Sequence, residues 1–168
     1  QLVAGEADKP LLEGGYYPGA REETALNFPP VKVDRTVREG DTVTLGDVTV
    51  TARETPGHSP GCTSWEFAVK DGDATRSVLI FCSGTVALNR LVTNPTHPGI
   101  VADYRKTFAR AKDMKPDVLL APHPEMYKMA EKRARLADGA PNPFVNPGEF
   151  NAYAVTLEKA FEDALVKQ

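Results

Sequence analysis

The sequence predicts an α/β (α+β) fold in which helices cover one side of a mixed sheet. Alternation of apolar and polar residues indicates several strands before position 82. Long helical patterns appear only after that position, on both sides of an apolar run at 117–121 that is typical of a strand covered on both faces. Strands first, and then strands alternating with helices, favour a layered arrangement of this kind.

Short elements and one long loop make up the beginning of the chain. A strand is expected at 2–4 and a short helix at 7–13, which ends at two glycines. Residues 14–30 contain glycine, proline and aromatic residues without a helical or strand period, so we expect a loop. It is either a lid or binding loop, or a surface excursion whose aromatic side chains pack on the body. Short strands are then expected at 31–34, 42–45 and 47–52.

A rigid loop at 54–65 presents one histidine, His58, between two strands. Prolines restrict the φ angle in this loop and glycines allow a tight bend, a design that suits a ligand better than a core residue. The apolar strand 117–121 leads to a second proline-flanked histidine, His123. Two histidines that converge at strand ends suggest a metal, and zinc accepts neutral imidazole readily. A single strand-end histidine, taken alone, is more often a structural residue.

A hairpin with strands at 62–69 and 77–82 is expected around Gly72. If the hairpin is symmetric about that glycine, Cys62 and Cys82 face each other on one side of the sheet. The sequence leaves two outcomes open, a disulfide or two buried thiols. The disulfide would fit an oxidising compartment such as the periplasm.

Cap signals mark the helices of the second half. Thr96 and Pro98 are typical cap and first-turn residues, so His97 is interpreted as a helix-start residue rather than a ligand. Asn146 and Glu149 have the spacing of a capping box at the start of the last helix, which is amphipathic and should pack on a sheet. The expected helices lie at 97–114, at 127–136 and from 146 onwards.

Composition limits the range of partners. The chain has 168 residues, of which 41% are hydrophobic and 26% charged, which is ordinary for one globular domain. A net charge of −3 argues against nucleic acid as a partner, and the basic stretch 128–135 is interpreted as a solvated helix face. No apolar run is long enough to cross a membrane, so no membrane partner is expected.

Three motifs resemble the later metal-binding motifs of the metallo-β-lactamase superfamily, and within it those of the third subclass of zinc β-lactamases. They are Thr-Pro-Gly-His-Ser-Pro-Gly-Cys-Thr-Ser-Trp at 55–65, Phe-Cys-Ser-Gly-Thr-Val-Ala-Leu-Asn-Arg-Leu-Val at 81–92 and Ala-Pro-His-Pro at 121–124. The superfamily signature His-x-His-x-Asp-His is absent, and the three histidines of the chain cannot supply it. We therefore expect residues 1–168 to form a single partial domain, the C-terminal portion of an αβ/βα metallo-β-lactamase sandwich.

The resemblance implies a zinc-dependent hydrolase that opens the β-lactam ring with a metal-bound hydroxide, using two zinc ions per intact domain. His58 would complete the first zinc site and His123 the second, and no catalytic residue is expected within this chain. Ser83 and Thr85, which follow the second hairpin strand, resemble hydroxyls that bind the substrate carboxylate or an ordered water, with strand-end capping as an equal alternative. The resemblance also implies a periplasmic or secreted location.

Two other functions stay open. Other superfamily members cleave thioesters, lactones or phosphoesters on the same metal scaffold, although a thioesterase relative would more often carry a metal-bridging aspartate where Ser83 stands. A non-catalytic half-domain could instead self-associate, because half of a sandwich exposes an apolar face. Its partner would be the missing N-terminal half or a second copy. The isolated chain is expected to be inactive, since two histidines cannot hold a two-metal site that needs about six ligands.

Overall fold

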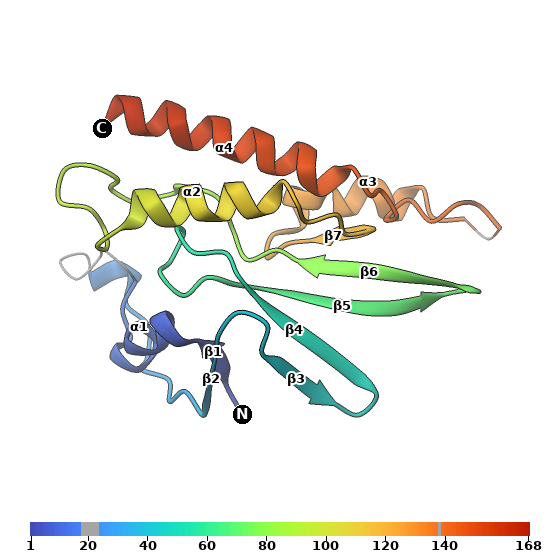
Figure 1. Cartoon of the computed structure of the whole chain (residues 1–168), viewed down its shortest axis with the longest axis horizontal. Coiled ribbons are helices and arrows are strands. Elements are labelled where there is room, and N and C mark those ends of the chain that lie inside the picture. Colours follow the sequence, from blue (N-terminus) through green and yellow to red (C-terminus); the bar gives the residue numbers. More distant parts are fainter. Residues whose placement is uncertain (18–23, 138) are drawn as a thin grey trace.

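The computed structural model describes residues 1–17, 24–137 and 139–168 and contains a five-stranded mixed sheet (Figure 1). The strands follow one another across this sheet in the order of the sequence. Neighbouring strands in it are antiparallel, except that β6 and β7 run parallel, which confirms the prediction of a mixed sheet. The strands are β3 (Thr42–Leu45), β4 (Val48–Glu54), β5 (Thr63–Asp71), β6 (Ala74–Ile80) and β7 (Val118–Leu120).

Two helices, α2 (Ile100–Ala111) and α4 (Glu149–Lys167), lie side by side over one face of the sheet (Figure 1). Leu79 and Leu119, which are paired neighbours in β6 and β7, belong to the buried core beneath these helices. An aromatic pair joins the two layers, since the ring centroids of Phe81, directly after β6, and Phe150, on α4, lie 5.1 Å apart. The prediction that helices cover one side of the sheet is therefore confirmed.

The beginning of the chain forms a small parallel sheet of its own, in which β1 pairs with β2. The predicted strand at 31–34 is wrong, because the N–H groups of Val31 and Val33 donate to the backbone of Leu12 and the carboxylate of Glu13 instead of to a strand. Part of the predicted loop at 14–30 lies outside the described residues. The elements here are β1 (Val3–Gly5), the 3-10 helix η1 (Glu6–Asp8), α1 (Lys9–Gly14), the 3-10 turn η2 (Thr24–Leu26) and β2 (Arg35–Val37).

The predicted helix caps are wrong at both long helices. Helix α2 begins after Gly99, whose φ of 80° prevents the helix from starting earlier. The Thr96 hydroxyl does not cap this helix, because it accepts a hydrogen bond from the N–H of Arg90. Helix α4 begins after Gly148, and no side chain caps it. The carboxylate of Glu149 does not close a capping box, because it pairs with Lys132.

A 3-10 helix η3 (Pro124–Tyr127) and a short helix α3 (Met129–Ala134) follow β7. The prediction of a solvated helix face at 128–135 is wrong for Lys132, which is buried, although the other basic residues of the stretch are exposed. Lys132 is buried because its ammonium group has an anionic partner on α4. None of the helices in the part of the chain that the structure describes is long and apolar enough to span a bilayer.

The sheet face opposite the helices remains partly open. The strand register places Trp65 beside Ile80, and Ile80 beside Leu120, on this face. Ile80 is 37% exposed, and Trp65 and Leu120 are only half-buried. The expectation of a β7 strand covered on both faces is therefore met on the helix side alone among the described residues.

Candidate metal site at the strand ends

The hairpin β5–β6 closes through a two-residue turn, and this displaces its register from the expected one. Asp71 pairs with Ala74, so the hairpin is not symmetric about Gly72. A regular ladder in this register would place the two cysteine side chains on opposite faces. The ladder between the two strands stops at the pair Trp65 and Ile80, which frees the chain beyond it.

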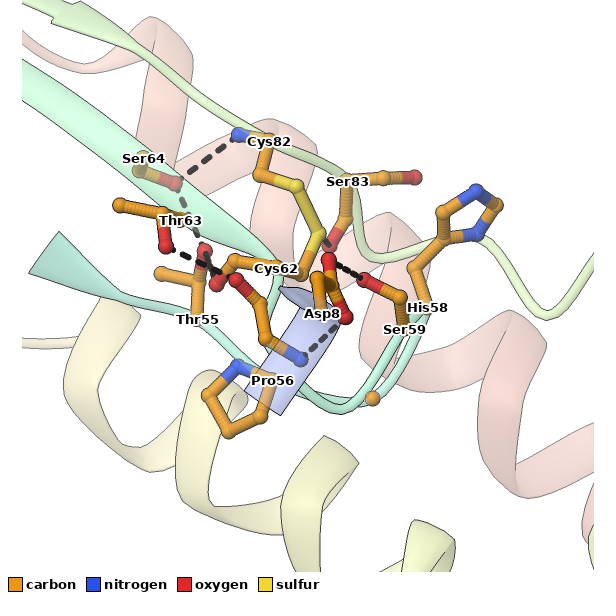
Figure 2. The surroundings of a disulfide bond; sticks show 12 residues. Asp8, Thr55, Pro56, His58, Ser59, Cys62, Thr63, Ser64, Cys82 and Ser83 are labelled. Carbon is orange, nitrogen blue, oxygen red and sulfur yellow. Dashed lines mark hydrogen bonds between the residues drawn. A yellow bond between two sulfur atoms is a disulfide. The ribbon is translucent and has the colours of Figure 1, made fainter. Parts of the chain in front are cut away.

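The freed ends are joined by a disulfide between Cys62 and Cys82, whose Cα atoms lie 5.8 Å apart. Of the two outcomes that the sequence left open, the structure shows the disulfide. The N–H of Cys82 donates to the hydroxyl of Ser64 at 2.9 Å rather than to a backbone carbonyl. Figure 2 shows how this disulfide joins the start of β5 to the segment that leaves β6, directly beside the loop that carries His58.

The loop 55–62 between β4 and β5 is closed at its base. The N–H of Thr55 donates to the carbonyl of Cys62 at 2.9 Å, and the buried hydroxyls of Thr55 and Ser64 lie 2.7 Å apart (Figure 2). These contacts span the two strands and fix where the loop begins and ends. The predicted rigid loop is confirmed.

Helix α2 supports the same loop from the helix side of the sheet. The hydroxyl of Thr107 donates to the carbonyl of Pro56 at 2.7 Å. Gly57 has a φ of 131°, and a Cβ at this position would lie 2.8 Å from the ring of Tyr104. Glycine is therefore required at position 57 both by the backbone angle and by the close approach of the helix.

The imidazole of His58 is held by a backbone carbonyl. Its Nδ1 lies 2.9 Å from the carbonyl oxygen of Thr85, and because a carbonyl can only accept, Nδ1 carries the proton. The lone pair of the imidazole is then on Nε2. A ring nitrogen that donates to a carbonyl while the other nitrogen stays free is the arrangement found in metal-binding histidines. The half-buried His58 thus fits a metal ligand.

Two buried side chains that the sequence did not single out complete this network. The phenol of Tyr104 donates to the same Thr85 carbonyl at 2.8 Å, and the amide of Asn89 donates to Tyr104 Oη and to the carbonyl of His58. Burial raises the pKa of the Tyr104 phenol well above its usual range, so it stays protonated as a donor. The Oδ1 atom of Asn89 is buried and has no partner among the described residues.

Ser83 and Thr85 lie on the segment that follows β6, where Thr85 contacts His58. The two hydroxyl oxygens are 3.1 Å apart, and the N–H of Thr85 donates to Ser83 Oγ at 3.2 Å. Ser83 is buried and Thr85 is half-buried. The capping interaction that was one alternative is therefore present. The Thr85 hydroxyl oxygen lies 3.3 Å from His58 Nδ1 as well.

His123 follows β7 at the same edge of the sheet. Because β6 and β7 are parallel with Ile80 opposite Leu120, Ser83 and His123 both stand three residues beyond one rung of the ladder. His123 is exposed and has an extended backbone at the start of η3. Within residues 1–17, 24–137 and 139–168, no three histidine, cysteine or acidic side chains form a group that could hold a metal. The described residues therefore do not form a complete metal site by themselves.

His97 is a buried supporting residue of the loop. Its Nε2 lies 3.3 Å from the carbonyl oxygen of Gly57, and its Nδ1 lies 3.3 Å from that of Pro98 and 3.6 Å from the Asp103 carboxylate. The expectation of a helix-start residue is wrong, because α2 begins three residues later, at Ile100. Both ring nitrogens face oxygen acceptors, which supports the interpretation that His97 is not a ligand.

Asp8 is the further residue that sequence reasoning missed. It lies beneath the loop and accepts hydrogen bonds from the Ser59 hydroxyl and the Gly61 N–H (Figure 2). Burial raises the pKa of the Asp8 carboxyl, although both hydrogen bonds favour its charged form. No spacing in the sequence indicates these contacts, because Ser59 and Gly61 lie 51 and 53 residues after Asp8.

Comparison with solved structures places this arrangement among known folds, whereas no family model matches the chain. BJP-1, a subclass B3 metallo-β-lactamase of Bradyrhizobium japonicum, matches 99% of the chain with 68% sequence identity and a TM-score of 0.98. FEZ-1, a metallo-β-lactamase from Legionella gormanii, matches 99% with 31% identity and a TM-score of 0.91. LRA-12, a class B3 di-zinc metallo-β-lactamase from an Alaskan soil metagenome, matches 97% with 28% identity and a TM-score of 0.84.

The chain spans less than two thirds of each of these proteins, namely 63% of BJP-1, 64% of FEZ-1 and 62% of LRA-12. The mixed sheet, its helix layer and the loops at its edge are those of the metallo-β-lactamase fold. The chain has the metallo-β-lactamase fold, is similar to subclass B3 metallo-β-lactamases over nearly its whole length and is consistent with a partial domain of that fold.

Proposed function

We propose that residues 1–168 are part of a zinc-dependent hydrolase that opens β-lactam rings, and that His58 and His123 are two of its metal ligands. The observation that carries this proposal is the imidazole of His58, whose Nδ1 faces the Thr85 carbonyl and whose Nε2 has no hydrogen-bond partner among the described residues. The similarity to BJP-1, at 68% identity, supports the choice of β-lactams over other substrates of the fold.

Zinc, when bound, lowers the pKa of a coordinated water to about 7 and polarises the carbonyl under attack. The residues of this chain would hold the metal and orient the substrate. The hydroxyls of Ser83 and Thr85 stand next to His58 and can donate to a substrate carboxylate. The remaining ligands are expected from outside this chain, because the His-x-His-x-Asp-His signature is absent from its sequence.

We also propose an oxidising compartment, such as the periplasm, as the site of action. The disulfide between Cys62 and Cys82 supports this, because disulfides persist mainly in such compartments. It lies beside the His58 loop, so the geometry of the candidate site is linked to the oxidised state of the protein.

The proposal predicts that a chimera regains hydrolysis when this chain replaces the matching part of BJP-1. His58→Ala in the chimera should lower kcat/KM for a cephalosporin by at least about 100-fold, since even the loss of groups that only orient a ligand costs 10-fold to about 100-fold. His123→Ala should do the same. The assay is the loss of cephalosporin absorbance at saturating zinc, with and without a chelator.

The isolated chain serves as the matched control and should show no chelator-sensitive hydrolysis. BJP-1 from which the matching part is deleted gives the background. Hydrolysis by the isolated chain, or full activity of the His58→Ala chimera, would contradict the proposed function.

A further inference from the structure

Both carboxylate oxygens of Asp8 accept hydrogen bonds from the loop that carries His58. Oδ2 accepts a hydrogen bond from the Ser59 hydroxyl at 2.6 Å, and Oδ1 accepts one from the Gly61 N–H at 2.7 Å. Hydrogen bonds to a charged acceptor are about twice as strong as neutral ones. One side chain of η1 is thereby linked to the residue directly after His58 and to the last glycine of the loop (Figure 2).

The backbones of the two segments also touch, which is an observation independent of these hydrogen bonds. A Cβ at Gly61 would lie 2.4 Å from the backbone nitrogen of Asp8, and a Cβ at Gly5 would lie 2.0 Å from the carbonyl oxygen of Gly61. Both distances are too short for any side chain. The two glycines therefore allow the segment 5–8 to lie directly against the loop.

The opposite side of the loop is fixed by other groups. The amide of Asn89 donates to the carbonyl of His58, and Cys62 is bonded to Cys82. Between these two attachments the loop backbone turns through residues 59–61, and Asp8 binds the first and last of these residues. Without the Asp8 carboxylate, residues 59–61 would lose their hydrogen bonds to η1, which is distant in the sequence.

We propose that Asp8 is a positioning residue, which fixes residues 59–61 and so holds the His58 ring with Nδ1 on the Thr85 carbonyl and Nε2 free. The importance of this for zinc rests on the proposed function, because it requires His58 to be a ligand. The positioning itself does not, since it is a property of the chain without metal.

The test compares variants of the zinc-free 168-residue chain. Asp8→Asn keeps the size of the side chain but has only one acceptor oxygen, so its NH₂ group faces one of the two donors. Ser59→Ala removes only one hydrogen bond and leaves the Gly61 N–H bonded. The matched control is Glu6→Gln, because Glu6 lies in the same 3-10 helix and its exposed carboxylate pairs with Arg38 rather than with a donor of the loop.

Two measurements report on the proposed role. Hydrogen exchange of the Gly61 amide should rise at least 10-fold in Asp8→Asn, rise less in Ser59→Ala and stay unchanged in Glu6→Gln. Long-range proton–nitrogen NMR of the imidazole should show His58 as the Nδ1–H tautomer in the native chain. In Asp8→Asn it should show a mixture of tautomers, which a purely structural effect elsewhere would not produce.

Unchanged Gly61 exchange and an unchanged His58 tautomer in a folded Asp8→Asn chain would overturn the proposal. Equal changes in Glu6→Gln would overturn it too, because they would indicate general destabilisation. If Asp8→Asn does not fold, Ser59→Ala decides in the same way. Zinc that fails to perturb His58 in the chimera with BJP-1 would count against the proposed function alone, since both measurements are made without zinc.

Discussion

Replacing Lys132 with alanine is expected to destabilise the chain by about 3–5 kcal/mol, because removing one partner of a buried ion pair leaves the other charge uncompensated. The ammonium group of Lys132 lies 2.5 Å from the Glu149 carboxylate, and the two side chains are only 6% and 15% exposed. The rings of Tyr127 and Phe144 lie near the same ammonium group, with centroids at 5.7 and 5.4 Å. The pair joins α3 to the first turn of α4.

Urea unfolding followed by circular dichroism measures this loss. The matched control is Lys112→Ala, whose partner is Glu158 and whose side chain is 63% exposed, so its loss should be below about 1 kcal/mol. Replacing both buried partners with apolar residues, as in Lys132→Met with Glu149→Leu, should recover much of the stability. A loss below about 1 kcal/mol for Lys132→Ala would contradict the assignment of a buried pair.

Reducing the disulfide between Cys62 and Cys82 is expected to cost about 3 kcal/mol of unfolding free energy, because the bond closes a loop of about 20 residues. Reduction of the bond raises the conformational entropy of the unfolded chain but not that of the native state, which favours unfolding. The ends that it joins lie beyond the regular ladder, so few other contacts replace it.

The urea midpoint of the oxidised chain is compared with that of the chain reduced by a phosphine. The variant with Cys62→Ala and Cys82→Ala should give a similar loss, and treatment with the phosphine should not destabilise it further. Equal midpoints for the oxidised and reduced forms of the native chain would contradict a stabilising role of the disulfide.

Local sequence patterns predicted the elements that position the candidate site. Alternation located β4 and β5 to within a few residues, and the prolines and glycines around His58 identified a rigid loop. Helical periodicity identified the last helix as amphipathic, and α4 buries one set of its side chains. These predictions succeeded because strand alternation, turn residues and helix periodicity depend only on neighbours in the chain.

Contacts between distant segments could not be predicted in the same way. The register of the hairpin depends on a two-residue turn, and a shift of one residue changes which side chains meet. Asp8, Asn89 and Tyr104 reach the loop from three other segments, and no spacing pattern encodes those approaches. The wrong caps have a similar cause, because Glu149 pairs with a residue of another helix.

The burial of β7 was not predicted correctly from its apolar sequence. Such a run predicts burial on both faces, yet Leu119 is 1% exposed while its neighbours Val118 and Leu120 are half-buried. An apolar run therefore does not by itself establish that both faces of its strand are covered.

The central claim, that His58 is a metal ligand, is tested most directly by long-range proton–nitrogen NMR of His58, His97 and His123 during a zinc titration of the chimera with BJP-1, because this chain alone supplies only two of the proposed ligands. Zinc should shift the Nε2 signals of His58 and His123. It should leave His97 unchanged, because both of its nitrogens face oxygen acceptors. Unchanged His58 signals at millimolar zinc, or a shift confined to His97, would contradict the account.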